Sequence, residues 1–178
     1  MRFFSTIACF LVFDIFSGSQ VKASETWSFG AELGGFHFRD EDFLSNLDVS
    51  SGAYLGFKIS MKLNEDFSLS LRAVSHASTE ELGSVREYIF NNFVGLIGEY
   101  HFWDPFYIRL GPGIVAAYNT LRNSDPRFGF GSDIGLGWTF WQSTAIAMDW
   151  NLSILPQWYQ SDDGGMAYLV ATGIGFNF

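Results

Sequence analysis

Three residues near the middle of the chain have types suited to ester hydrolysis: His76, Ser78 and Glu87. A serine hydroxyl becomes a nucleophile when a histidine accepts its proton, and a third polar residue commonly orients that histidine. His76 and Ser78 lie two positions apart, so a β-strand places them on the same face. Apolar residues occupy the alternate positions from Phe67 to Ala73, which turns His76 and Ser78 toward the opposite face. Because such short motifs often arise by chance, we predict no catalytic residue in the chain.

Metal and cofactor sites have little support in the sequence. His37 and His101 are far from His76 and do not form a spacing typical of metal ligands. The only cysteine is Cys9, near the N-terminus. An acidic segment offers carboxylates for a divalent cation, although its spacing does not match a calcium-binding loop. Its carboxylates are Asp40, Glu41, Asp42 and Asp48. We therefore expect no cofactor and no metal.

The first 23 residues have the pattern of a secretory signal peptide. Arg2 precedes an apolar stretch rich in phenylalanine, and Val21 and Ala23 occupy positions −3 and −1 of a cleavage site. Asp14 interrupts the apolar stretch, which leaves it too short to remain in a bilayer as a helix of about 20 residues. We expect residues 1–23 to be removed and residues 24–178 to form one domain.

Charge and hydrophobicity exclude two broad classes. The formal net charge is −9 and no basic cluster is present, which argues against nucleic acid as a partner. Hydrophobic residues make up 48% of the chain and aromatic residues 19%. After residue 23, however, no apolar run approaches the length of a membrane-spanning helix. The apolar surface must therefore be presented by strands.

Apolar residues alternate with small or polar ones in eight stretches, a pattern typical of transmembrane β-barrel strands. Since successive side chains of a strand point to opposite faces, one face suits lipid and the other a polar interior. In the first stretch Phe36 and Phe38 break the alternation after Gly34 and Gly35, and we expect a glycine bulge there to restore it. The stretches are 27–38, 53–63, 67–78, 88–103, 106–119, 128–141, 144–160 and 166–178.

The connections between these stretches alternate in length. Residues 64–66, 104–105 and 142–143 form very short connections, while the other four are longer and polar. Short periplasmic turns and longer outer loops are typical of bacterial outer-membrane barrels. The sequence therefore predicts an all-β fold, an eight-stranded antiparallel up-and-down transmembrane β-barrel.

The last stretch ends in an aromatic residue, Phe178, with Phe176 and Ile174 on the same strand face. This ending and the strand pattern resemble the eight-stranded outer-membrane barrels of the OmpA and OmpX type over about residues 26–178. The resemblance implies a bacterial outer-membrane location and contact with outer-membrane lipid and lipopolysaccharide. It also implies that Phe178, Phe176 and Ile174 form the signal recognised by the barrel-insertion machinery.

The inward face is expected to carry four acids and four bases. Buried charges must pair or remain hydrated, and an eight-stranded interior is largely filled by its own side chains. We predict a structural network of salt bridges, with a gated ion path as the alternative. Because directly paired residues share a face, Arg109 is expected opposite Glu99 or His101. The interior charges are Glu32, Lys58, Lys62, Arg72, Glu99, Arg109, Asp133 and Asp149.

These features favour a non-enzymatic outer-membrane barrel that contributes to envelope integrity or surface interaction through its outer loops. One alternative is a lipid A or phospholipid hydrolase, because His76 and Ser78 are similar to the His-x-Ser pair of outer-membrane phospholipase A and the PagL deacylase. Those enzymes present the pair to lipid, and in the PagL type it is expected near the C-terminal strands, where this chain has no histidine. A small ion channel is the other alternative.

Overall fold

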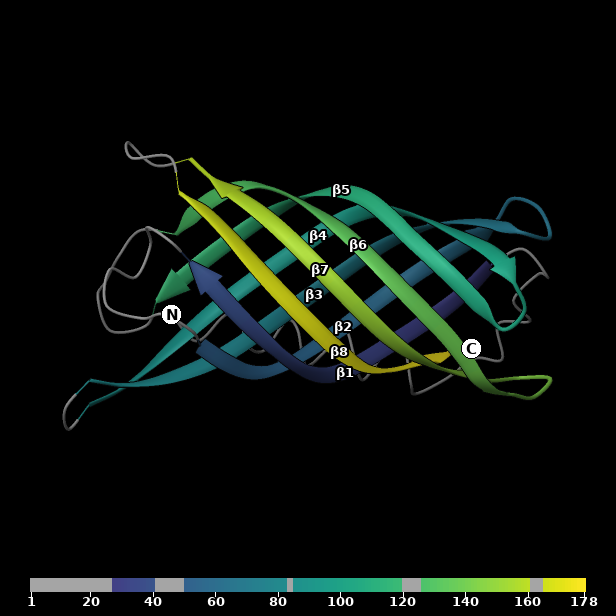
Figure 1. Ribbon diagram of the computed structural model, residues 1–178, viewed down its shortest axis with the longest axis horizontal. Coiled ribbons are helices and arrows are strands. Elements are labelled where there is room, and N and C mark those ends of the chain that lie inside the picture. The colour runs from purple at the N-terminus through teal and green to yellow at the C-terminus, as the bar shows by residue number, and fades with distance from the viewer. Residues whose placement is uncertain (1–26, 41–49, 83–84, 120–125, 161–164) are drawn as a thin grey trace.

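A computed structural model describes residues 27–40, 50–82, 85–119, 126–160 and 165–178. They form eight antiparallel strands that close into a barrel, with β1 paired to β8 (Figure 1). This confirms the predicted fold class. Within the described residues, no helix is long and apolar enough to cross a membrane. The strands are β1 (Trp27–Asp40), β2 (Ser50–Lys62), β3 (Phe67–Leu82), β4 (Val85–Trp103), β5 (Phe106–Asn119), β6 (Arg127–Gln142), β7 (Ala147–Tyr159) and β8 (Met166–Asn177).

Two sequence predictions fall on segments outside the described residues. One is the signal peptide at residues 1–23, and the other is the acidic segment, of which the described residues include only Asp40. These remain predictions.

Three strand connections lie at one end of the barrel and four at the other. We call the end where β2 joins β3, β4 joins β5 and β6 joins β7 the turn end, and the opposite end the loop end. At the turn end, Asn64 Oδ1 accepts hydrogen bonds from the backbone N–H groups of Asp66 (3.0 Å) and Phe67 (2.8 Å). Ser143 Oγ accepts one from the N–H of Ile146 (3.1 Å). Short polar side chains thus satisfy the backbone of these tight turns.

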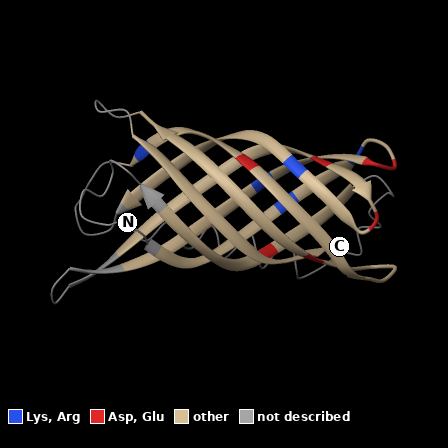
Figure 2. Ribbon diagram, viewed as in Figure 1, with Lys and Arg blue, Asp and Glu red and all other residues tan. Residues whose placement is uncertain are grey.

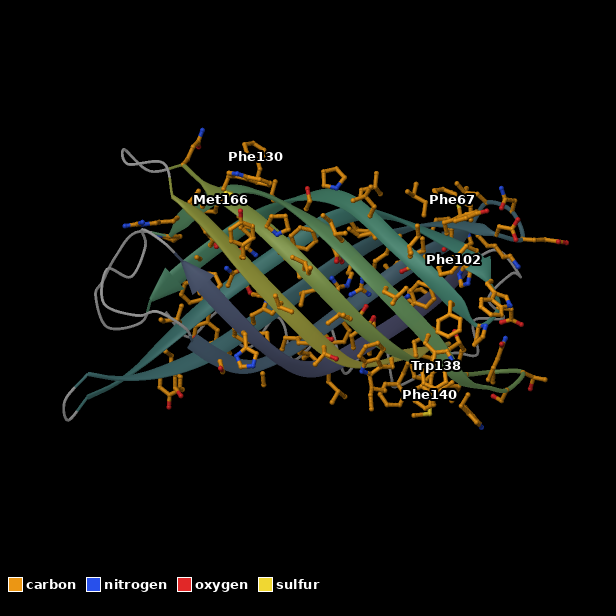
Figure 3. All side chains as sticks on the ribbon, in the orientation of Figure 1. Phe67, Phe102, Phe130, Trp138, Phe140 and Met166 are labelled. Atoms are coloured by element: carbon orange, nitrogen blue, oxygen red, sulfur yellow. The ribbon has the colours of Figure 1, made fainter. Side chains whose placement is uncertain are left out.

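Aromatic side chains form two belts on the outer face, separated by an aliphatic band. Figure 3 shows Phe102, Trp138 and Phe140 near the turn end and Phe130 near the loop end, all pointing away from the barrel. The band between them consists of exposed Leu and Ile side chains such as Leu110. Other exposed belt residues are Trp27, Tyr100, Trp103, Trp141, Trp150 and Phe178 at the turn end, and Tyr88, Phe128, Trp158 and Tyr168 at the loop end.

Charge is absent from the outward positions between the two belts. The described Lys, Arg, Asp and Glu residues between the belts are buried inside the barrel, and the others lie in its turns and end segments. Figure 2 marks the positions of these residues along the ribbon. The strand alternation predicted from the sequence is therefore confirmed, with the apolar face outside. A water-soluble barrel would place its large apolar residues inside instead.

The expected bulge at Gly34 and Gly35 is wrong. β1 keeps a continuous register with β2 and β8 through both glycines, so Phe36 and Phe38 share the inward parity of Glu32. The prediction assumed that aromatic residues belong outside, whereas the loop-end half of this interior is largely apolar. We call its buried cluster the apolar plug: Phe36, Phe38, Tyr54, Val74, Phe93, Ile97, Val115, Ala117, Leu155, Tyr159, Ala167, Leu169 and Ala171.

Inward-facing glycines make room for large side chains on neighbouring strands. Tyr107 of β5 pairs with Gly137 of β6, and its ring lies where a Cβ of residue 137 would be. Arg109 pairs with Gly135 and covers it in the same way, with Nε 2.6 Å from the position of a Cβ. The glycine-rich β6 is thus packed against bulky side chains of its neighbour β5.

The substitution Gly137→Ala is expected to lower the free energy of unfolding by about 1–3 kcal/mol, because the added methyl group displaces the Tyr107 ring. Urea unfolding in lipid vesicles measures this change. Gly56→Ala is the matched control, since its Cβ would meet Val74 Cγ2 at an ordinary 3.4 Å. Equal stability of Gly137→Ala and wild type would mean that Tyr107 does not cover this position.

β3 and β4 extend beyond their neighbours at the loop end and form a projecting hairpin (Figure 1). The pairing of β3 with β2 stops at Ser78, and that of β4 with β5 stops at Ile89, whereas β3 and β4 pair with each other up to Leu82 and Val85. Residues 79–87, expected to be a loop, are therefore mostly strand. Glu87 therefore lies in β4, and its backbone is paired with that of Glu80 in β3.

Candidate functional site in the barrel interior

Arg72 lies at the centre of a charge network in the middle of the barrel. Its Nε and Nη2 atoms donate hydrogen bonds to both carboxylate oxygens of Glu32, at 3.1 and 2.7 Å. Its Nη1 atom donates to Asp133 Oδ2 at 2.5 Å. The three side chains come from β3, β1 and β6 and are almost completely buried. This fork geometry is the strong form of an arginine–carboxylate pair.

Arg109 joins the same two carboxylates from β5. Its Nη1 atom lies 3.6 Å from Glu32 Oε1 and its Nε atom 3.3 Å from Asp133 Oδ2. It also donates hydrogen bonds to Asn151 Oδ1 (2.8 Å) and to Ser153 Oγ. The register places Arg109 opposite Glu99, as predicted. Its carboxylate partners are instead Asp133 on the neighbouring strand β6 and Glu32 on β1, which it reaches across the interior.

A second ion pair lies closer to the turn end. Lys58 Nζ donates to both carboxylate oxygens of Glu99, at 3.0 and 3.3 Å, and lies 5.8 Å from the centre of the Tyr107 ring. Asp149 accepts hydrogen bonds on Oδ2 from the Tyr107 hydroxyl (3.2 Å) and from Asn177 Nδ2 (2.5 Å). These groups form the floor of a cavity that opens at the turn end.

Seven of the eight residues predicted for the interior charge network are buried inside the barrel. Lys62 is the exception: it lies at the end of β2, is exposed, and lines the cavity opening. The alternation of side chains along β2 predicted that Lys62 faces inward, but alternation does not show how far along the barrel axis a residue lies. The sequence reasoning missed three uncharged partners, Tyr107, Asn151 and Asn177. Tyr107 and Arg109 of β5 contact Asp149 and Asn151 of β7, and Asn177 of β8 contacts Asp149, and alternation along a single strand does not predict contacts between strands.

The turn-end cavity has a volume of about 540 Å³ and polar walls. Its floor is formed by Lys58, Glu99, Tyr107, Asp149 and Asn177, and its rim includes residues of the three turns. Beyond the charge network, the apolar plug and a hydrogen-bonded cluster of Asn91, Gln157 and Tyr159 fill the loop-end half. Phe93, Leu155 and Leu169 there have no exposed surface. No group of three or more His, Cys, Asp or Glu side chains suited to a metal ion occurs among the described residues.

His76 and Ser78 point into the barrel, as their parity predicted. Both are buried, and His76 Nδ1 lies 3.1 Å from the backbone carbonyl oxygen of Asn91. The His76 ring also packs edge-on against Phe36, with 5.1 Å between ring centres. The space beside His76 and Ser78 has a volume of only about 10 Å³, which is too small for a lipid substrate.

A different histidine and serine form a hydrogen-bonded pair on the outer face. His37 of β1 and Ser51 of β2 are paired across the strands, with 2.8 Å between Nδ1 and Oγ, and both are exposed near the loop end. The sequence offers no spacing signal for this pair, since the residues are 14 positions apart and only the strand register brings them together. Among the described side chains, no carboxylate contacts His37 to orient it.

Comparisons with solved structures agree with the barrel architecture. The chain is similar to Neisserial surface protein A, with a TM-score of 0.56 and 11% identity over 85% of this chain and 95% of that protein. It is also similar to Ail, the attachment invasion locus protein of Yersinia pestis, solved with the heparin analogue sucrose octasulfate, with a TM-score of 0.53 and 16% identity over 87% of this chain and all of that protein. No protein-family model matches the sequence, and no curated protein matches it. The chain therefore has the fold of the small eight-stranded outer-membrane β-barrels.

Proposed function

We propose that the chain is a non-enzymatic outer-membrane protein that acts at the bacterial surface through its loop end. The observation that carries this proposal is the outer face: an aliphatic band, free of described charged residues, between two aromatic belts. This arrangement suits a lipid bilayer, because the apolar band matches the hydrocarbon core and aromatic rings favour its two interfaces with water. Closure of the barrel also satisfies the backbone hydrogen bonds that lipid cannot satisfy.

The interior supports a structural role over transport. The salt bridges Arg72–Asp133 (β3 to β6) and Arg109–Glu32 (β5 to β1) join strands across the barrel, and the apolar plug lies between them and the loop end. A small ion channel would require that plug to open. The rigid scaffold instead supports the loop-end segments, which are the part available to partners.

The chemistry of the loop end indicates which partners fit. The first loop-end segment is acidic in sequence, with Glu41, Asp42 and Asp48, and the last contains Asp162 and Asp163. Carboxylates in these two segments suit lipopolysaccharide phosphates bridged by divalent cations, which favours a contribution to envelope integrity. Ail was solved with a polyanionic heparin analogue, but an acidic surface repels polyanions, so we do not extend that ligand to this chain.

Insertion by the barrel-insertion machinery through Phe178, Phe176 and Ile174 is part of the same proposal. These side chains lie on the outer face of β8, with Phe178 and Ile174 exposed. The backbone of Phe178 pairs with Phe29 at 2.7 and 3.1 Å, so the chain end also closes the barrel against β1.

Epitope tags test the proposed location and orientation in cells. One tag is placed between Asp162 and Asp163 at the loop end, and a matched tag between Glu65 and Asp66 at the turn end. We expect both variants in the outer-membrane fraction, with antibody binding to intact cells only for the loop-end tag. A comparison of detergent sensitivity in cells with and without the chain then tests the contribution to envelope integrity. Recovery in the soluble fraction, or equal labelling of both tags, contradicts the proposal.

The His37–Ser51 hydrogen bond favours a second candidate, a hydrolase of lipid A or phospholipid. The pair lies on the outer face, where a membrane enzyme meets lipid. In that reading His37 accepts the Ser51 proton as Oγ attacks an ester carbonyl and passes it to the departing alcohol oxygen. Water then hydrolyses the acyl-serine, which releases the fatty acid and restores Ser51. Mass profiles of lipid from cells expressing wild type or Ser51→Ala, with Ser78→Ala as the matched control, decide between the candidates. A deacylated product lost only in Ser51→Ala supports the hydrolase, and identical profiles exclude it.

A further inference from the structure

The buried charges of the barrel do not balance. The described residues with buried side chains include the carboxylates of Glu32, Glu99, Asp133 and Asp149, but only three cations, Lys58, Arg72 and Arg109. Glu32 and Asp133 pair with the two arginines and Glu99 with Lys58. Asp149 is the carboxylate left without a cation, and its Oδ1 atom is buried with no hydrogen-bond partner among the described residues. Its Oδ2 atom accepts hydrogen bonds from Tyr107 and Asn177, but a buried carboxylate without a cation nearby is unfavourable, so this position suits a positively charged group.

Asp149 lines the turn-end cavity, which is anionic as a whole. The carboxylates around it are Glu65, Asp66, Glu99, Asp104 and Asp149, against Lys58 and Lys62, which gives five negative and two positive charges and a net charge of −3. Glu65, Asp66 and Asp104 are exposed at the rim. The field of such a cleft attracts cations and concentrates them at its floor.

The oxygen atoms at the cavity floor suit an ammonium group, which donates hydrogen bonds, rather than a metal ion. No metal-type cluster of His, Cys, Asp and Glu occurs in the described part of the chain. Ser60 Oγ, a second buried oxygen without a partner among the described residues, lines the same cavity as Asp149. An ammonium group has three hydrogens to donate, and oxygen acceptors such as a carboxylate and a hydroxyl satisfy them. The cavity volume of about 540 Å³ far exceeds one ammonium group, so it accepts a longer molecule.

We propose that the turn-end cavity binds a linear organic polyammonium compound, with one ammonium group on Asp149 and another at the acidic rim. The carbon chain between them lies against the walls near Tyr107 and His101, whose rings are 5.1 Å apart. In the proposed orientation this cavity opens to the periplasm. The binding site itself does not depend on the surface role, because it is tested on the purified barrel.

Calorimetric titration of the folded chain in zwitterionic detergent at low salt, with spermidine as the probe, tests this site. We expect 1:1 binding to wild type and at least about tenfold weaker binding to Asp149→Asn, since the ammonium group loses a charge-assisted hydrogen bond in a shielded position. Asp66→Asn is the matched control: it removes the same charge from the exposed rim, and its affinity should fall less than about threefold. Thermal unfolding of each variant confirms that it is folded.

Three outcomes overturn the proposal. Absence of spermidine binding to folded wild-type protein excludes the site. Equal affinity of wild type and Asp149→Asn assigns the binding to the rim alone. Binding that appears only in Lys62→Gln shows that the exposed Lys62 side chain turns inward and supplies the missing charge itself.

Discussion

Replacement of Arg72 by methionine is expected to lower the free energy of unfolding by about 3–5 kcal/mol. Arg72 holds Glu32 through two hydrogen bonds and Asp133 through a third, and all three side chains are buried. Methionine fills part of the volume of the arginine side chain but leaves both carboxylates without the Arg72 charge. Removing one partner of a buried ion pair lowers stability strongly, because the remaining charge stays buried and unpaired. Arg109 remains near both acids, at 3.6 and 3.3 Å, and compensates only partly.

Urea unfolding of the barrel in lipid vesicles, followed by tryptophan fluorescence, measures the effect. Lys62→Met is the matched control, because Lys62 points toward the same interior but is exposed at its mouth. We expect it to change stability by less than about 1 kcal/mol. The triple variant Glu32→Gln, Arg72→Met, Asp133→Asn should recover much of the loss, since no charge is then stranded. If Arg72→Met were as stable as Lys62→Met, the network would be hydrated rather than buried.

The substitution Ile134→Arg is expected to cost about 2–4 kcal/mol, because it places a cation in the middle of the aliphatic band. Ile134 is central in β6 and faces outward, 48% exposed, between Leu110 of β5 and Ile154 of β7. In a bilayer this position lies near the hydrocarbon centre, where the guanidinium group cannot reach water easily.

Ile108→Arg is the matched control for this second prediction. Ile108 has the same residue type and a similar exposure of 47%, but it lies near the turn end and pairs with Tyr100 of the aromatic belt. Its arginine reaches the interface, so the expected cost is about 0–1 kcal/mol. Urea unfolding in vesicles gives both values. A larger cost at Ile108 than at Ile134, or none at either, would contradict the proposed depth of the barrel in the bilayer.

The strands could be predicted because each one repeats the same two-residue alternation, so the pattern is local. The apolar face of β7, for example, is evident from Trp150, Leu152 and Ile154, which alternate with Asp149, Asn151 and Ser153. The sequence analysis placed Phe36 and Phe38 on the outer face by predicting a bulge. Alternation distinguishes two strand faces, but it does not show that the interior changes from polar to apolar along the barrel axis. That change depends on packing among side chains from several strands.

The interior charges were found from parity, but their pairing was not. Glu99 is the register partner of Arg109, yet it pairs with Lys58, while Arg109 reaches Glu32 and Asp133. Side chains that cross a closed barrel meet partners from strands that are distant in sequence. The same holds for the His37–Ser51 pair, which only the register of β1 and β2 brings together.

The central claim, that the apolar outer face belongs in a bilayer, is tested most directly by one folding measurement. The chain is purified in urea, diluted into lipid vesicles or into buffer alone, and run on a gel with and without boiling. We predict that only the vesicle sample gives a second band of different mobility without boiling, because a closed barrel resists the gel detergent until heated. A monomeric, folded, soluble chain in buffer without lipid or detergent would contradict the account.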